Sequence, residues 1–127
     1  IDFIRCHIPY IGGLTPARKV AALGELFGVR TAWHGPADLS PVGHAANVHL
    51  DLATWNFGIQ ERTVFTREEQ EIFPGCPTLA NGYLLANDRP GLGIDIDEGL
   101  AARFPIPADH VSWYASLRYN DGTVRRH

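Results

Sequence analysis

Four polar side chains lie at or near the ends of apolar, strand-like stretches of the sequence. Arg5 lies in DFIRCHI, His34 ends VRTAWH, Asp38 follows it in WHGPADLSP, and Glu61 ends NFGIQE. Where strands alternate with helices, the loops after the carboxyl ends of the strands gather on one face, and functional groups lie there. The four side chains are therefore predicted to share one site.

Each of the four brings a particular chemistry. A guanidinium such as that of Arg5 can hold a carboxylate through two parallel N–H bonds, which an ammonium cannot match. His34 can donate a hydrogen bond or exchange a proton near neutral pH, and Glu61 can accept hydrogen bonds from hydroxyl groups. Asp38 comes just before a predicted helix, whose unpaired N–H groups favour an anion.

Each residue also has an ordinary structural explanation when it is taken alone. These explanations are a salt bridge for Arg5, packing beside Trp33 for His34, a helix entrance for Asp38 and a solvated strand end for Glu61. Their common position in successive strand–helix units is what favours the functional interpretation.

Two further groups of polar residues favour structural roles. His44 and His49 are five residues apart, which does not put both imidazoles on one helical face, and no third ligand follows at a useful spacing. Asp95, Asp97 and Glu98 form an acidic cluster, but the first turn of any helix favours acids. We therefore predict no metal site within this chain.

The composition is that of one ordinary globular domain and excludes several classes of function. The chain has 127 residues, 45% of them hydrophobic, and a formal net charge of −3. Because no cluster of Lys and Arg carries interleaved aromatic residues, we expect no nucleic-acid partner. The apolar stretches are shorter than the ~20 residues of a membrane-spanning helix, so we expect a soluble, cytoplasmic protein without a membrane partner.

The cysteines and the short motifs indicate no disulfide framework, phosphate-binding loop or nucleophile elbow. Cys6 and Cys76 are expected to be free thiols, because two cysteines 70 residues apart form neither a disulfide framework nor a metal-ligand pair. The GLG at 91–93 lacks the strand-to-helix context of a phosphate-binding loop, and no nucleophile elbow is present.

The elements that must position the four residues are strands alternating with helices. Strands are predicted at 2–8, 29–34 and 56–61. The first helix is predicted to begin with Thr15 as N-cap and Pro16 at its first position, and to end at Gly28. The second repeats this signature at Ser40 and Pro41. This order, with its short loops, is typical of a parallel β/α arrangement.

The apolar faces of the two helices follow from residue spacing. The first is predicted to use Val20, Leu23, Leu26 and Phe27, and the second Ala45, Val48 and Leu52. Because three parallel strands with two crossover helices leave much of the sheet uncovered, a further segment or chain is expected to complete it. The chain also contains no methionine and begins directly in a strand-like run, which is typical of a piece of a longer protein.

The second half of the chain changes character. Residues 66–77 are charged and then turn-forming, short strands are predicted around Asn81-Gly82, a brief helix is predicted in 95–105, and a hairpin is predicted at 120–122.

Several blocks of the sequence resemble one family. They are RTAWHGPADLSPVGHAANVHLDLA, FGIQE, EIFPGCPTLANGYLLANDRPGLGIDIDE and the closing RYNDGT. Over nearly the whole chain they are similar to the C-terminal portion of the D-mannonate dehydratase family of the enolase superfamily. Members of that family are also labelled starvation-sensing proteins or mandelate racemase/muconate lactonizing enzymes.

The resemblance implies an α/β fold that is the C-terminal part of a modified (β/α)8 barrel. Residues 1–62 would be the last β/α units, holding about the last three strands. Residues 63–127 would be a C-terminal segment and a tail that packs on an N-terminal capping domain missing from this chain. The resemblance also implies that the intact parent is a homo-oligomer with a small-molecule sugar acid as its substrate.

The reaction implied is dehydration of D-mannonate to 2-keto-3-deoxy-D-gluconate, by removal of the proton α to the carboxylate and loss of the 3-hydroxyl. A magnesium ion, Mg2+, would stabilise the enediolate. Arg5, His34, Asp38 and Glu61 match the family's substrate-contacting positions. The family's metal ligands and acid/base residues lie upstream, so the resemblance implies no catalytic residue and no metal ligand in this chain, which alone would be inactive.

Three alternatives remain open. The first is that the parent is a D-gluconate dehydratase of the same family. The second is a non-catalytic regulatory or binding homologue, which fits the WYAS stretch and the VRRH ending, because both differ from the family's usual tail. The third is a segment with no activity of its own.

Overall fold

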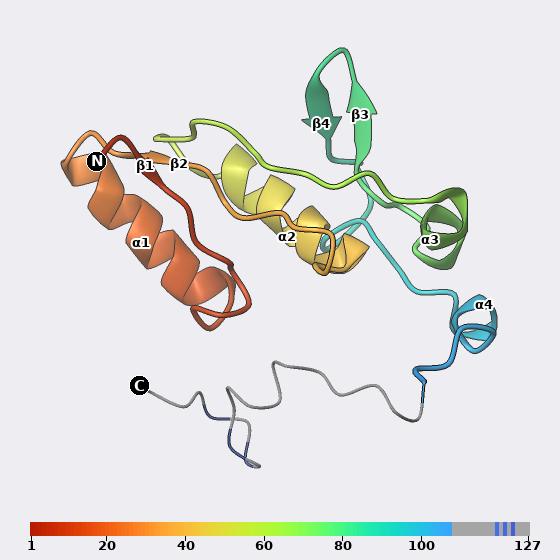
Figure 1. Cartoon of the computed structure of the whole chain (residues 1–127). Coiled ribbons are helices and arrows are strands. Elements are labelled where there is room, and N and C mark those ends of the chain that lie inside the picture. The colour runs from red at the N-terminus through yellow and green to blue at the C-terminus, as the bar shows by residue number, and fades with distance from the viewer. Residues whose placement is uncertain (108–118, 120, 122, 124–127) are drawn as a thin grey trace.

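The computed structural model of the chain describes residues 1–107, 119, 121 and 123 (Figure 1). Its elements in chain order are β1 (Phe3–Ile4), α1 (Leu14–Leu26), β2 (Arg30–Thr31), α2 (Pro41–Leu52), α3 (Arg67–Ile72), β3 (Thr78–Ala80), β4 (Tyr83–Leu85) and α4 (Glu98–Ala101). The WYAS stretch, the VRRH ending and part of the predicted hairpin at 120–122 lie outside the described residues.

The first sixty residues form the predicted alternation of strands and helices. β1 pairs in parallel with β2, with Phe3 opposite Arg30 and Ile4 opposite Thr31. Backbone hydrogen bonds continue this pairing to the N–H of His34, which donates to the Cys6 carbonyl over 3.0 Å. The α/β class and the order of the strands are confirmed.

The third strand is much shorter than predicted. Instead of a strand over 56–61, the structure has one parallel bridge between Thr31 and Phe57. The N–H groups of Gly58 and Ile59 both donate to the single carbonyl of Thr31, so the two segments diverge after this point and a regular ladder does not continue. A closed barrel stays a prediction, because the described strands form an open sheet.

Helix α1 starts differently from the prediction. It begins at Leu14 after Gly13, with no side-chain cap, so the assignment of Thr15 as N-cap is wrong. The N–H of Gly13 instead donates to the Ile8 carbonyl over 2.9 Å, which closes a turn before the helix. This turn places Gly13 at a φ of 101°, a conformation that glycine adopts without steric cost. Pro16 then falls in the first turn, where its missing N–H costs nothing.

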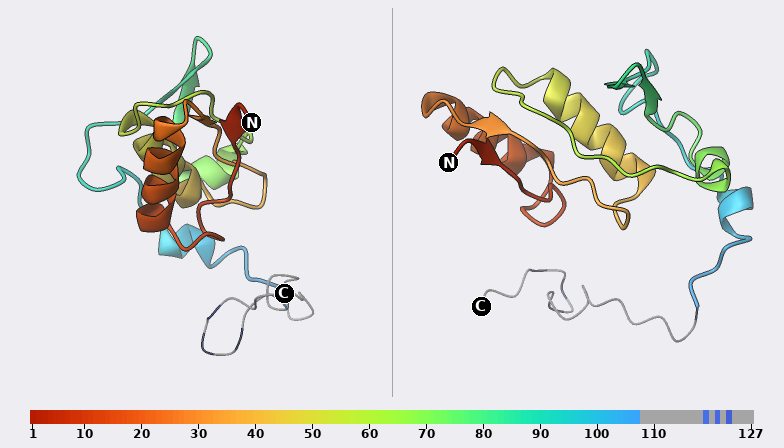
Figure 2. Two further views of the ribbon diagram at one scale, coloured as in Figure 1. Left: turned by 90° about the vertical axis from the view of Figure 1, so that its left-hand side faces the viewer. Right: turned by 45° about the horizontal axis from the view of Figure 1, so that its top comes forward.

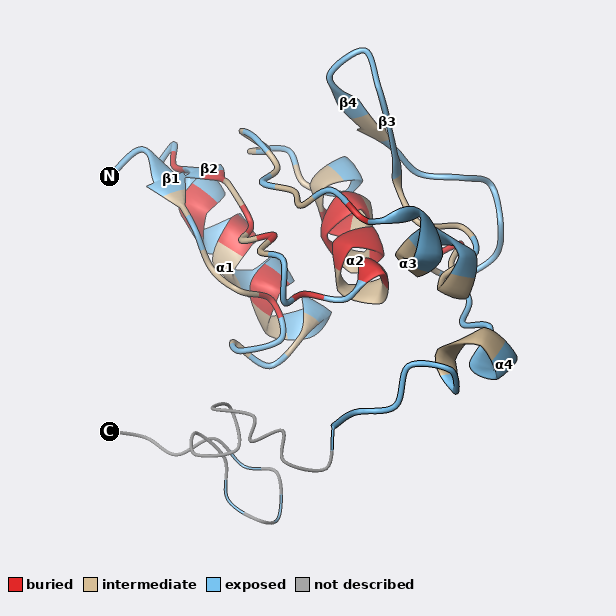
Figure 3. Ribbon diagram, turned by 45° about the vertical axis from the view of Figure 1, so that its right-hand side comes forward, coloured by how far each residue is buried: buried red, intermediate tan, exposed pale blue. Residues whose placement is uncertain are grey.

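The buried face of α1 is made of small residues. Ala17, Ala21 and Gly24 are buried, and a Cβ at position 24 would collide with the side chain of Ile4. Of the predicted face, Val20 packs partly buried against the core, but Leu23 and Phe27 are 58% and 75% exposed. Close packing of α1 on β1 therefore selects the small residues, and the larger apolar residues remain on the surface (Figure 3).

Helix α2 agrees with its predicted start. The Ser40 hydroxyl accepts a hydrogen bond from the Gly43 N–H over 3.3 Å, and Pro41 occupies the first helical position. Ala45 and Val48 are buried as predicted, but Leu52 at the end of the helix is exposed. Figure 2 shows α1 and α2 as successive helices beside the short strands.

The main core lies between the strands and the two helices. Trp33, with no exposed surface, packs with four other buried residues, namely Ile8, Ala17, Ala21 and Leu50. Because Trp33 lies between β2 and His34, its burial fixes the backbone that carries His34.

The second half of the described chain contains one predicted hairpin and one unpredicted helix. Asn81 and Gly82 both have positive φ, at 51° and 84°, as the two central residues of a tight hairpin turn require. Thr66 and Glu69 cap α3 reciprocally, a T-x-x-E pattern that the sequence already contained. Asp97 caps α4, the predicted brief helix, by accepting from the Leu100 N–H over 2.9 Å.

Helices that are long and apolar enough to cross a membrane are absent from the described part of the chain.

The core assignment can be tested with two tryptophans. Trp33→Ala removes a fully buried side chain and is expected to lower the free energy of unfolding by about 3–5 kcal/mol in urea denaturation. Trp55→Ala is the matched control, because Trp55 is 93% exposed, and its expected change is below about 0.5 kcal/mol. Equal losses in the two variants would contradict this core.

Candidate functional site

Three of the four predicted site residues meet where β1, β2 and residues 56–61 end. Nη2 of Arg5 donates to both carboxylate oxygens of Glu61, over 3.0 and 2.9 Å. Nδ1 of His34 lies 2.6 Å from Oε2 of Glu61. The parallel arrangement of the three segments thus brings together side chains that are up to 56 residues apart in sequence.

The proton arrangement in this cluster follows from its geometry. Nδ1 of His34 lies 2.6 Å from Glu61 Oε2 and equally close to Arg5 Nη2. Guanidinium nitrogens only donate, whereas Nδ1 can donate only when it carries the proton. A protonated Nδ1 donates to Glu61, whose carboxylate then accepts from His34, Arg5 and the Gly35 N–H. In this arrangement Glu61 holds Arg5 and His34 side by side.

The carboxylate of Glu61 is strongly favoured in its charged form. The hydrogen bond from His34 is the largest cause, and the bonds from Arg5 and from the Gly35 N–H act in the same direction. Together they lower the pKa of Glu61 from its ordinary value of 4.5 to about 2. Glu61 is therefore ionised at neutral pH and acts only as a hydrogen-bond acceptor.

The backbone that carries His34 is held from both sides. The side-chain amide of Asn47, a buried residue on α2, donates to the His34 carbonyl over 3.2 Å. The amide of Gln60 donates to the Trp33 carbonyl over 3.0 Å. Gly35 then allows a close approach, because a Cβ there would collide with the backbone carbonyl of Glu61. These contacts explain why a glycine follows His34.

Asp38 is not part of the three-residue cluster. It is exposed on the loop between β2 and α2, and the structure gives it no hydrogen bond to Arg5, His34 or Glu61. The structure thus brings Arg5, His34 and Glu61 together, and a shared site that includes Asp38 stays a prediction. The charge of Asp38 is felt instead by His7, whose pKa it tends to raise.

His7 also belongs to this neighbourhood, although it was not predicted as a site residue. Its ring stacks on Tyr10 with centroids 4.1 Å apart and meets the ring of His34 edge-on at 5.4 Å. Burial and the neighbouring His34 lower the pKa of His7, which favours the neutral imidazole. The available signal was the spacing: Arg5 and His7 are two residues apart in an extended segment, so both point to one side.

Two other described histidines contact backbone carbonyls. His44 is buried, and its Nε2 lies 3.3 Å from the Pro36 carbonyl. Nε2 of His49 lies 3.2 Å from the Leu92 carbonyl, which ties α2 to the second half of the chain. Among the residues that the structure describes, His, Cys, Asp and Glu side chains form no group of three or more that could hold a metal ion. Cys6 and Cys76 are free thiols, as predicted.

The pKa of Glu61 predicts a specific dependence of stability on acid. Because its pKa is lower in the folded chain, its contacts stabilise the fold above about pH 4.5, and this contribution is lost as the pH falls toward about 2. In Glu61→Gln, the unfolding midpoint is expected to fall less steeply as the pH is lowered from about 4.5 to about 2. Glu71→Gln, which removes an exposed pair with Arg67, is the control and is expected to keep the original slope. An unchanged slope in Glu61→Gln would argue against the cluster.

Two known proteins with similar sequences are both much longer than this chain. D-galactonate dehydratase family member RspA of Pantoea ananatis is 57% identical over 126 residues, a match that covers 99% of this chain and 30% of the relative. A D-galactonate dehydratase family member of Enterococcus gallinarum is 46% identical over 127 residues, covering 99% and 31%. The chain thus spans about 30% of the length of the curated relatives it matches.

Two solved structures that resemble this chain are also much longer than it. A crystal structure of an enolase from Pantoea ananatis with bound D-gluconate and magnesium matches with a TM-score of 0.83 and 56% identity, over 100% of this chain and 30% of that one. A mandelate racemase/muconate lactonizing enzyme from Jannaschia sp. CCS1 matches with a TM-score of 0.70 and 32% identity, over 78% and 25%.

The family assignment rests on most of the chain. The model of the enolase C-terminal domain-like family matches residues 1–100, which include β1, α1, β2, α2 and the whole Arg5–His34–Glu61 cluster. Strand order, the cluster at the strand ends and this match agree, and the chain belongs to the enolase C-terminal domain-like family.

Proposed function

We propose that this chain is the C-terminal part of a magnesium-dependent sugar-acid dehydratase in which Arg5, His34, Asp38 and Glu61 contact the substrate. The observation that carries the proposal is the convergence of Arg5 and His34 on Glu61 at the ends of three neighbouring parallel segments. Two hydrogen-bond donors, one of them a guanidinium, and one ionised acceptor in one place suit a ligand that carries both a carboxylate and hydroxyl groups.

The proposed roles follow from the hydrogen-bonding capacity of each group. Arg5 and His34 would donate to oxygen atoms of the sugar acid, because both side chains present N–H groups beside a single carboxylate. Glu61 would accept from substrate hydroxyl groups. Asp38, exposed on the β2–α2 loop, would approach the ligand from the side of His7.

The substrate we propose is D-mannonate, which would lose the proton α to its carboxylate and the 3-hydroxyl to give 2-keto-3-deoxy-D-gluconate. D-Gluconate is the second candidate, because the Pantoea ananatis enolase binds D-gluconate and magnesium. The related proteins named as D-galactonate dehydratase family members also support a sugar acid as the class of substrate.

The magnesium ion of the proposal cannot be held by the described residues alone. The cluster offers one carboxylate, Glu61, and this carboxylate already accepts from Arg5 and His34. The metal ligands and the acid/base residues are accordingly proposed to lie in parts of the full-length protein outside these 127 residues. The contribution of this chain is then to bind and orient the substrate.

The organisation of the full-length protein is part of the same proposal. Residues 1–62 would form the last β/α units of a (β/α)8 barrel, and residues 63–127 a C-terminal segment that reaches a capping domain. The full-length protein would self-associate as a homo-oligomer.

The activity can be tested directly on the full-length protein. Incubation with D-mannonate or D-gluconate and magnesium is expected to form a 2-keto-3-deoxy acid, which can be detected as an α-keto acid, and EDTA is expected to abolish its formation. Competition between the two acids measures which is preferred. Binding of a sugar acid without product would support a non-catalytic homologue and contradict the dehydratase.

The role of Arg5 can be tested by a conservative change. Arg5→Lys keeps the charge but removes the planar pair of N–H donors, so kcat/KM in the full-length protein is expected to fall about tenfold or more. Arg67→Lys, in an exposed ion pair on α3, is the matched control and should leave kcat/KM unchanged. Equal kcat/KM in Arg5→Lys and the wild type would remove Arg5 from the proposed substrate contacts.

A further inference from the structure

His7 places an imidazole beside the candidate site without using its hydrogen-bonding groups. Both ring nitrogens are buried, and neither has a hydrogen-bond partner among the residues that the structure describes. A phenyl ring would fill the same space without the free-energy cost of burying two unpaired polar atoms. Hydrogen bonding therefore does not account for this side chain, and the contacts of its ring are what remains to explain it.

The place of the His7 ring is set by the backbone around it. The His7 carbonyl accepts from the Tyr10 N–H over 3.0 Å, in the turn that follows β1. The next residue, Ile8, is 3% exposed and packs in the main core. On the preceding side, the Cys6 carbonyl accepts from the His34 N–H over 3.0 Å. The parallel register thus brings the backbone of His7 next to that of His34.

The His7 ring contacts two other aromatic rings. It stacks on Tyr10 with centroids 4.1 Å apart and planes 18° from parallel, and it meets the His34 ring at 72° with centroids 5.4 Å apart. Stacked and edge-on arrangements are both favoured by aromatic pairs. Burial, the largest cause, and the neighbouring His34 lower the pKa of His7, while the charge of Asp38 acts in the opposite direction. A neutral ring can remain against His34 without like-charge repulsion.

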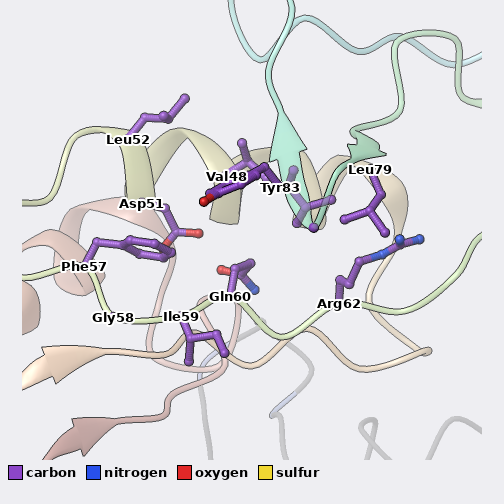
Figure 4. Close-up of a pocket in the computed structure, with 12 residues that line it drawn as sticks. Val48, Asp51, Leu52, Phe57, Gly58, Ile59, Gln60, Arg62, Leu79 and Tyr83 are labelled. Carbon is purple, nitrogen blue, oxygen red and sulfur yellow. The ribbon is translucent and has the colours of Figure 1, made fainter.

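Other contacts hold the backbone of His34 but not its ring. Gln60, which lines the groove shown in Figure 4, donates through its amide to the Trp33 carbonyl over 3.0 Å. Asn47 donates to the His34 carbonyl over 3.2 Å. Because both bonds end on main-chain atoms, they do not set the rotation of the imidazole.

The polar contacts of the His34 ring meet at one corner. Arg5 Nη2 and Glu61 Oε2 both lie 2.6 Å from Nδ1, and the hydrogen bonds between described residues do not include one at Nε2. Contacts at a single atom allow the ring to tilt about that atom, so the direction of Nε2 requires a second restraint. The edge-on ring of His7 is in place to supply it.

We propose that His7 is a positioning residue, whose ring holds the His34 imidazole so that Nε2 faces the bound ligand while Nδ1 meets Glu61. Tyr10 supports the His7 ring by stacking on it. This inference rests on the proposed function, because it takes His34 to be a substrate contact, and it assigns His7 no contact with the substrate. Since the ring and not its nitrogens acts, phenylalanine should replace His7, and an aliphatic residue should not.

Two substitutions in the full-length protein separate the ring of His7 from its nitrogens. His7→Phe keeps the ring, whereas His7→Leu keeps an apolar side chain and removes the aromatic faces. With magnesium and the better substrate of D-mannonate and D-gluconate, kcat/KM is expected to stay within about twofold of the wild type in His7→Phe and to fall about fivefold or more in His7→Leu. Equal kcat/KM in the two variants, whether high or low, would overturn the proposal.

The Tm of the same variants separates a loss of positioning from a loss of folding. Both substitutions remove two unpaired buried nitrogens, so the Tm of each is expected to equal or exceed that of the wild type. A lower Tm in His7→Phe would show that the nitrogens contribute hydrogen bonds in the full-length protein and would contradict the assignment to the ring.

Crystal structures of the two variants without ligand measure the orientation of His34 directly. In His7→Phe, Nδ1 of His34 is expected within about 3.2 Å of Glu61, as in the wild type. In His7→Leu, the His34 ring is expected to be tilted by about 30° or more or to occupy two orientations. An unchanged ring in His7→Leu would overturn the proposal. This readout uses neither substrate nor activity, so its failure is distinguishable from failure of the proposed dehydratase.

His49→Leu is the matched control for loss of a histidine. Nε2 of His49 lies 3.2 Å from the Leu92 carbonyl, and the described ring contacts of His34 do not include His49. This variant is expected to change neither kcat/KM nor the orientation of the His34 ring. A similar tilt of His34 in His49→Leu would show a general response of the fold and would contradict a specific role for His7.

Discussion

The carboxylate of Glu61 is the contact on which the candidate site depends. It accepts hydrogen bonds from Arg5 after β1, from His34 after β2 and from the backbone of Gly35, so one anion connects the ends of three neighbouring segments. Without it, a guanidinium and an imidazole 2.6 Å apart would repel each other whenever both were charged. The parallel register that places His34 beside Cys6 and the turn at Gly35 both serve this one arrangement.

Local patterns predicted the elements that depend on local chemistry. The Ser40-Pro41 helix start, the Asn81-Gly82 hairpin and the order of parallel segments all appear in the structure. The start of α1 was wrong because a contact with Ile8, five residues before Gly13, decides it. The buried face of α1 was wrong because packing against Ile4 favours small residues over large ones, which spacing alone does not reveal.

In the candidate site, too, some positions follow from the order of the strands and others depend on contacts that the sequence pattern does not reveal. Reasoning from strand ends found Arg5, His34 and Glu61, because parallel topology alone is enough to bring them together. It also placed Asp38 at this site, which stays a prediction, because Asp38 lies exposed on a loop and makes no hydrogen bond to the other three. It missed His7, whose ring stacks on Tyr10 and meets the ring of His34 edge-on.

The central claim is that Arg5, His34 and Glu61 hold the oxygen atoms of a sugar acid. A crystal structure of the full-length protein with D-mannonate or D-gluconate bound tests it most directly. The account predicts carboxylate or hydroxyl oxygens of the ligand within about 3.2 Å of all three side chains, with the Glu61 contacts to Arg5 and His34 retained or exchanged for the ligand. A sugar acid bound elsewhere, with the three side chains still paired only to one another, would contradict it.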